Sequence, residues 1–262
     1  MIDEMIIREL NKLKKIIGDI ETREHTHPTF GGAVSFDGNI VFNESGLAAN
    51  DFRVESDTEA NMILLDSSAN NIELGGTTNG VKIEKGGAMT LLGNGRVINT
   101  VNLGIDGLSQ GATAPGVVKV VNYYGYAFKV NDDGFVRPFE IPYNWDTRTA
   151  IEFKIHWYCN NTSASKYIKW QVDYSSVQED SENVNVATTT TDSGDVAVPT
   201  TAYKLNETTI SIPAAGLAQD DVMGIQIKRI QSSGGPGAVP DNYPVVVSLE
   251  IEITCDRLGE LM

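Results

Sequence analysis

Residues 151–159 read Ile-Glu-Phe-Lys-Ile-His-Trp-Tyr-Cys, with an apolar side chain at every second position. Strict alternation of this kind is typical of a β-strand that has one face in a core and the other toward solvent. We expect the inner face to carry Ile151, Phe153, Ile155, Trp157 and Cys159. The outer face should then carry the charged side chains together with His156 and Tyr158. This stretch predicts a strand of a sheet rather than a helix.

The same alternation recurs at 168–174, 223–229 and 245–255, where Val246 should face outward. Shorter strands are expected at 126–130, 184–190 and 207–212. Strands with one apolar face, joined by polar loops, predict a mainly β fold, with a jelly-roll-like antiparallel β-sandwich as head domain over residues 117–262. Cys159 and Cys255 should both point inward as buried thiols. Nothing in the sequence requires a disulfide between them.

A glycine-rich segment precedes this domain and occupies residues 29–116. Residues 31–116 hold 15 of the 25 glycines, and apolar pairs such as Ile72/Leu74 and Val81/Ile83 lie between turn signals. Strands this short cannot build a core alone and need neighbouring strands to cover them. We therefore predict a Gly-rich intertwined β shaft, because a helical seam just upstream would hold several chains in register; a single chain coiled into a solenoid is the alternative. A compact sandwich is a further alternative, but its strands should be longer.

Residues 1–28 form the third region, a predicted helix over 1–22 followed by a linker that ends at Pro28. Apolar residues recur at spacings of four and three, the pattern of a coiled-coil seam. The seam residues are Ile6, Leu10, Leu13, Ile17 and Ile20. A helix of this length is marginal alone in water, so we expect copies to associate, and the mixture of Ile and Leu is compatible with three. An amphipathic helix lying on its own domain is the alternative.

Charge excludes several classes of function. The chain has 262 residues and a formal net charge of −15 at pH 7. Such an acidic chain repels phosphate backbones and anionic lipid, which argues against a nucleic-acid or membrane-surface partner. No stretch approaches the roughly 20 apolar residues of a membrane span, and no secretory signal peptide is expected.

Four short segments resemble a repeat found in tail-fibre and other structural proteins of tailed bacteriophages. They are Val41-Phe-Asn-Glu-Ser-Gly46, Asn50-Asp-Phe-Arg-Val-Glu-Ser-Asp57, Met62-Ile-Leu-Leu-Asp66 and Ile72-Glu-Leu-Gly75. The resemblance covers residues 41–76 alone. It implies a homotrimeric fibre or spike on the virion surface, at the tail or the capsid, assembled in the host cytoplasm. Other virion proteins would bind its N-terminus, and the head would meet a host-surface glycan or protein.

Two local motifs are candidate sites. His25-Thr-His27 resembles a motif with which some phage fibres bind iron through imidazoles of three chains, and it also suits two exposed linker histidines. No other cofactor is expected. Tyr143 and Trp145 are candidates for stacking on a sugar, although such aromatics also cap cores. One predicted loop is acidic, and its carboxylates would either be solvated or bind calcium. They belong to Glu179, Asp180, Glu182, Asp192 and Asp195.

No catalytic set is visible, so we do not expect an enzyme. His156 should face outward, and the pairs Asp132/Asp133 and Asp220/Asp221 lie in turn contexts. Three alternatives to a receptor-binding fibre remain open. The protein would be a capsid decoration, head-fibre or neck-fibre protein, a small tailspike depolymerase, or a free lectin-like module.

Overall fold

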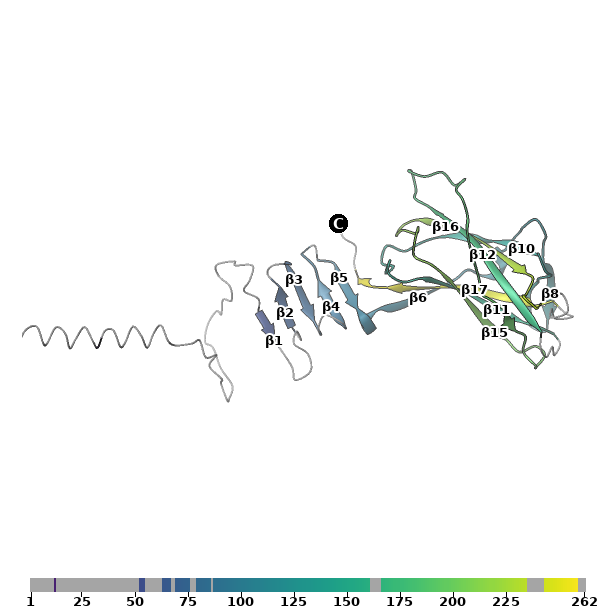
Figure 1. Cartoon of the computed structure of the whole chain (residues 1–262), viewed down its shortest axis with the longest axis horizontal. Coiled ribbons are helices and arrows are strands. Elements are labelled where there is room, and N and C mark those ends of the chain that lie inside the picture. The colour runs from purple at the N-terminus through teal and green to yellow at the C-terminus, as the bar shows by residue number, and fades with distance from the viewer. Residues whose placement is uncertain are drawn as a thin grey trace, which may run out of the picture. The chain divides into compact units, whose positions relative to one another are not determined.

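A computed structural model of the chain describes Lys12 and residues 52–54, 63–66, 69–75, 79–85, 87–160, 166–234 and 243–258 (Figure 1). The chain divides into two compact units, Met1–Glu44 and Ser45–Met262. Lys12, which is helical and exposed, is the described residue of the first unit. The predicted coiled-coil seam and the His25 and His27 site lie outside the described residues, so both remain predictions.

The first part of the second unit is an antiparallel sheet, here called the meander sheet. It consists of β1 (Phe52–Val54), β2 (Ile63–Asp66), β3 (Asn71–Leu74), β4 (Gly80–Ile83) and β5 (Met89–Leu92), and β18 (Arg257–Leu258) closes its other edge. Each of β1 to β4 pairs with the next strand along the chain. The predicted short strands are therefore present, and one chain pairs them into consecutive hairpins. Intertwining of several chains stays a prediction.

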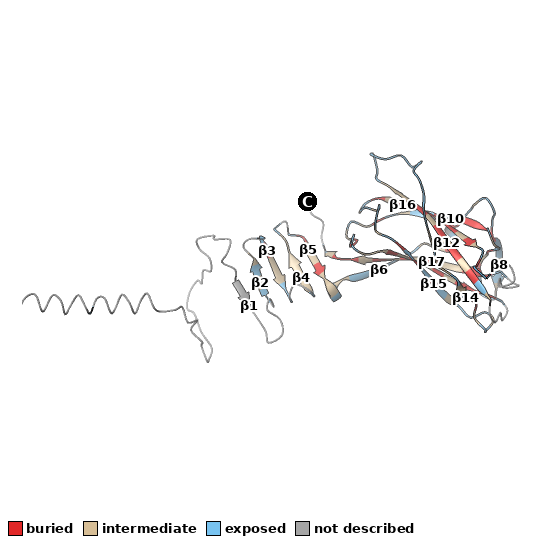
Figure 2. Ribbon diagram, in the orientation of Figure 1, coloured by how far each residue is buried: buried red, intermediate tan, exposed pale blue. Residues whose placement is uncertain are grey.

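One face of the meander sheet is apolar throughout. The register places Ile63 opposite Leu74 and Leu65 opposite Ile72, and the same face continues across β4 and β5. Its members are Ile63, Leu65, Ile72, Leu74, Val81, Ile83, Met89 and Leu91. Leu65 and Leu74 each keep 40% of their surface exposed, and no residue of β2 or β4 is fully buried (Figure 2). The described part of this chain leaves Ile63, Leu65 and Leu74 exposed on this face, whereas Leu91, near the sandwich, is buried.

Two further antiparallel sheets form the predicted sandwich. The first, here called the groove sheet, has the order β13 (Thr189–Asp192), β12 (Tyr167–Val177), β16 (Val222–Ile230), β10 (Asp133–Glu140) and β7 (Ser109–Gln110), with β14 (Val196–Ala197) beside β12. The second, here called the hairpin sheet, has the order β15 (Asn206–Ile212), β11 (Ile151–Tyr158), β17 (Val245–Cys255), β9 (Tyr123–Ala127) and β8 (Gly116–Val120), with β6 (Val97–Asn102) also on β17. The 3-10 turns η1 (Gly93–Gly95) and η2 (Ile105–Gly107) flank β6.

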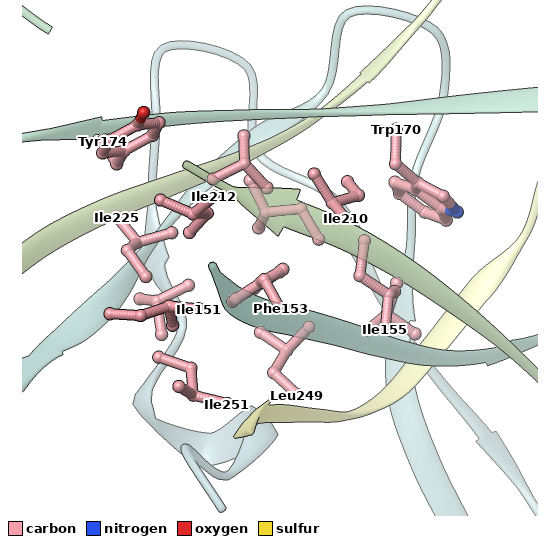
Figure 3. Packing of buried hydrophobic residues seen from close by; sticks show 14 of the residues in the cluster. Ile151, Phe153, Ile155, Trp170, Tyr174, Ile210, Ile212, Ile225, Leu249 and Ile251 are labelled. Atoms are coloured by element: carbon pink, nitrogen blue, oxygen red, sulfur yellow. The ribbon is translucent and has the colours of Figure 1, made fainter. Parts of the chain in front are cut away.

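The core lies between these two sheets, and Figure 3 shows side chains of both meeting there. The alternation that the sequence displays in β11, β12 and β16 is the alternation of buried and half-buried residues in the structure. Trp145, Trp157 and Trp170 are all fully buried. The predicted mainly β, antiparallel sandwich is thus confirmed, and both cysteines are free and buried in it. Within the described ranges, no helix is long and apolar enough to cross a membrane.

A bulge corrects two predicted orientations. The pairing of β11 with β17 shifts between His156 and Trp157, so that Trp157 lies opposite Val246. Val246 is therefore fully buried and Val247 only half-buried, although the alternation placed Val246 outward and Val247 inward. Tyr158 keeps the outward orientation expected for it, and Tyr203 covers it there. A bulge adds one residue to one strand and reverses the alternation beyond it.

One strand and two boundaries also differ from the prediction. The strand β10 at 133–140 was not foreseen, because Gly134 and Pro138 interrupt its pattern, and the strand expected at 184–190 is β13 at 189–192. The change from shaft to head was placed at residue 116, yet β6 and β7 already belong to the sandwich sheets. The chain also returns at its other end, where β18 pairs with β5.

Candidate functional site

A groove lies on the outer face of the groove sheet and has a volume of about 430 Å³. Three neighbouring strands form it. Phe135 on β10 lies opposite Gln226 on β16, and Gln226 lies opposite Asp173 on β12. These three side chains therefore form one row across the sheet, because residues paired in register share a face. Volumes of this size are typical of ligand-binding sites.

The next row of paired residues forms the floor of the groove. Ser175 on β12 pairs with Gly224 on β16, and the irregularity in β10 places Arg137 on the other side of Gly224. A Cβ atom added at Gly224 would meet no atom within 4 Å. The hollow therefore exists because a strand position between Met223 and Ile225 carries no side chain.

Hydrogen bonds orient the polar side chains of the groove. The Oδ1 atom of Asp173 accepts from Gln171 Nε2 at 2.9 Å and from Thr190 Oγ1 at 2.6 Å. The Nε2 atom of Gln226 donates to the buried carboxylate of Asp133, which also accepts from the backbone N–H of Thr113 at 2.8 Å. Both side chains are thus positioned by neighbours rather than free to rotate, which lowers the entropy lost when a ligand binds.

An aromatic ring and a cation complete the site. Phe135 is 48% exposed and lines the groove, so its ring is accessible to a ligand there. Arg137 lines the groove and has no ion-pair partner among the described residues.

By contrast, Lys169 on the same sheet lies 3.0 Å from Asp192. Burial opposes the ionisation of Asp192, but the N–H of Gly194 and the Lys169 ammonium outweigh it, so its pKa lies below the usual range.

The candidates proposed from the sequence lie elsewhere. Trp145 is fully buried in the core, and its backbone forms an isolated β-bridge with Cys255. Its ring is therefore not accessible to a sugar, and the prediction that it stacks on one is wrong. Tyr143 is exposed but does not line the groove, and its role stays a prediction. His156 is half-buried, with Nε2 3.3 Å from Glu250.

The acidic loop and the turn carboxylates are engaged within the protein. Asp195 accepts from the backbone N–H of Ser233 at 3.0 Å, and these hydrogen bonds lower its pKa. Asp132 accepts from the N–H of Lys129 at 2.7 Å, and Asp221 from that of Ala218 at 3.1 Å. Among the described residues, no group of three or more His, Cys, Asp or Glu side chains is placed to hold a metal.

Sequence reasoning missed the groove for a physical reason. Phe135, Asp173 and Gln226 lie far apart in the chain, and only the strand order β12-β16-β10 makes them neighbours. Gly224 sits in an apolar, alternating row and looks like a weak strand position. A glycine in a strand interior often marks close approach or open space, and this was the available signal.

Comparisons with known proteins add a limited likeness of fold. No family model and no curated protein matches the chain. Among solved structures, a xylan-binding module, CBM15, is 13% identical, covering 62% of this chain and 99% of its own, with a TM-score of 0.36. The CBM36-1 domain of a multidomain xylanase from the hindgut metagenome of Trinervitermes trinervoides is 14% identical, covering 58% and 96%, with a TM-score of 0.35.

A virus particle structure is also similar. The structure of infectious bursal disease virus, Gx strain, is 12% identical and covers 87% of this chain and 49% of the matched chain, with a TM-score of 0.32. Similarity at this level carries no argument about ligand or assembly.

Proposed function

We propose that this protein is a homotrimeric phage fibre or spike whose β-sandwich head attaches to a host-surface glycan. The groove over Gly224 is the observation that carries the proposal. Its binding residues would be Phe135, Arg137, Asp173 and Gln226. No bond is made or broken in this function.

The chemistry of the groove suits a sugar. A pyranose ring has an apolar C–H face that packs on an aromatic ring, and Phe135 offers such a ring at the wall. Its hydroxyl groups both donate and accept, which matches the carboxylate of Asp173 and the amide of Gln226. A mainly apolar surface with a few oriented polar groups is the usual composition of a ligand site.

The groove supports binding rather than cleavage. Glycoside hydrolysis uses two carboxylates that flank the scissile bond. Asp173 is the single carboxylate among the described residues that line this groove. The carboxylate of Asp133 is buried and occupied by hydrogen bonds.

The apolar face of the meander sheet supports association of copies. Leucines and isoleucines on that face lose solvent contact if identical sheets pack together, which stabilises an assembly by about 25 cal/mol for each Å² buried. The predicted N-terminal seam would hold those copies in register. Three weak sugar sites on one trimer gain apparent affinity through effective concentration.

A glycan panel tests the proposal with the purified complete chain. We expect the protein to bind one class of host-surface polysaccharide. Phe135→Ala should bind it about tenfold more weakly, because stacking on the ring contributes about 1.5 kcal/mol. Tyr124→Ala is the matched control, since that ring is exposed outside the groove. Equal loss in both variants, or no binding by the parent protein, would count against the groove.

A further inference from the structure

A second hollow lies on the hairpin sheet and differs from the groove in chemistry. It has a volume of about 380 Å³ and is lined by Val120, Val121, Tyr123, Tyr158, Tyr203 and Leu205. None of these side chains carries a charge at neutral pH. Three of the six are tyrosines, contributed by the β8–β9 hairpin, the end of β11 and the segment before β15.

Two of the tyrosines form adjoining walls. The ring centroids of Tyr158 and Tyr203 are 5.9 Å apart, and the rings are tilted by 40°. The N–H of Tyr203 donates to the carbonyl of Cys159 at 2.7 Å, which ties its segment to the end of β11. The walls are therefore fixed relative to each other by the backbone.

The backbone is strained at two lining residues. Val121, at the turn between β8 and β9, has a φ of 52°, and Tyr203 has a φ of 59°. Bulky side chains rarely adopt this region, and such strain persists where function requires a particular side-chain position. Val121 is 81% exposed and Tyr203 is 56% exposed, so neither conformation is repaid by burial in this chain.

The pocket also contains an unmet hydrogen-bonding group. Tyr158 is 5% exposed, and its hydroxyl has no partner among the described residues. Burial, and then the proximity of Tyr203, raises the pKa of this phenol, so it stays a neutral donor. This hydroxyl has almost no accessible surface, so its missing partner is a cost of the fold that an ordered water would relieve.

We propose that this pocket binds a quaternary ammonium group of the choline type. The faces of aromatic rings carry negative charge density, and rings arranged as a cage attract methylated ammonium ions. The methyl groups would contact Val120, Val121 and Leu205. The chain's net charge of −15 and the absence of a cation among the lining residues also favour a positive ligand.

The pocket is well placed to reach a partner. Tyr158 pairs with Val245 at the first residue of β17, whereas Cys255 at the last residue pairs with β6. An 11-residue strand spans roughly 33 Å. The pocket therefore lies at the other end of β17 from the point where β18 joins the meander sheet. This site is separate from the groove and does not depend on glycan binding.

Ligand-observed NMR titration of the complete chain tests the assignment with two probes of equal shape. Choline chloride carries the cation, and 3,3-dimethylbutan-1-ol replaces the nitrogen with a neutral carbon. We expect choline to bind at least about tenfold more tightly than the neutral probe. Equal affinity would show that the pocket takes apolar groups regardless of charge and would overturn the proposal, as would no binding of choline.

Variants locate the binding. Tyr203→Leu keeps the apolar volume but removes the ring, so choline affinity should fall at least about tenfold, whereas Tyr203→Phe should retain it. Tyr143→Leu is the control because Tyr143 is exposed outside the pocket. Choline binding that survives Tyr203→Leu unchanged would place the ligand elsewhere and overturn the assignment.

Discussion

At the scale of single residues, Asp146 is a buried carboxylate held between two cations. Its side chain is 1% exposed, Arg148 Nε lies 2.7 Å away and Arg96 Nε lies 3.2 Å away. Burial opposes ionisation, but the hydrogen bonds and charge of Arg148, with the charge of Arg96, outweigh it, so the pKa of Asp146 lies below its usual value. Asp256 shares Arg148 at 3.1 Å, and burial and then Asp146 raise the pKa of Asp256.

We expect Asp146→Asn to lower the free energy of unfolding at neutral pH by about 2 kcal/mol, because charged hydrogen bonds are lost in a buried site. A folded-state pKa below the unfolded value gives stabilisation that is complete above the unfolded pKa and is lost as the pH falls through the folded value. In urea unfolding, the gap between the two proteins should therefore close below about pH 4. Asp106→Asn, at an exposed carboxylate, should change little. A gap that persists in acid would contradict the ion pair.

Individual residues also show where sequence patterns stop being informative. The inward positions of Ile151 and Trp170 could be predicted, because each belongs to a long alternating row. Trp145 could not, since it lies in a turn with no periodic neighbours to place it. Val246 was predicted to face outward because the bulge in β17 leaves no mark in the alternation.

At the scale of elements, the β8–β9 hairpin is fixed by one close approach. Gly125 on β9 is buried, and an added Cβ would press on the carbonyl oxygen of Val246 and lie 2.9 Å from Val245 Cγ1. The hairpin thus approaches β17 at a distance that only glycine permits. The second hollow, on the hairpin sheet, depends on this approach, because its lining residue Tyr123 is two residues away on the same strand.

We expect Gly125→Ala to lower the free energy of unfolding by about 3 kcal/mol through overpacking. Gly116→Ala on the adjacent strand is a matched control, because a Cβ at Gly116 meets no atom within 4 Å. Thermal and urea unfolding of both variants would measure the difference. Equal stability of the two variants would mean that the hairpin does not lie against β17 as described.

Element types were easier to predict than their partners. The four long strands β11, β12, β16 and β17 are evident in the sequence, whereas β10 is hidden by Gly134 and Pro138. The strand order that creates the groove is a property of long-range pairing. Local pattern does not determine which strand lies between two others, so neither the groove nor the return of β18 to β5 could be predicted.

At the scale of the whole molecule, the account requires several copies to cover the apolar face of the meander sheet. We expect light scattering coupled to size exclusion to give a mass near three times 28.4 kDa. Leu65→Lys should lower that mass, because it places a charge on the apolar face. Glu73→Gln, on the opposite face of the same sheet, is the control, because that position is already polar. A monomeric parent protein would contradict the trimer.

If the groove over Gly224 binds a host-surface glycan, filling it with the variant Gly224→Val should prevent binding. Valine suits a strand and meets no atom at its Cβ, so the fold should be at least as stable while the groove is filled. Gly116→Val makes the same change at an open position outside the groove. We would measure affinity for the best-retained polysaccharide by titration calorimetry. The account predicts that Gly224→Val abolishes binding and that Gly116→Val retains it. Full binding by a folded Gly224→Val protein would contradict it.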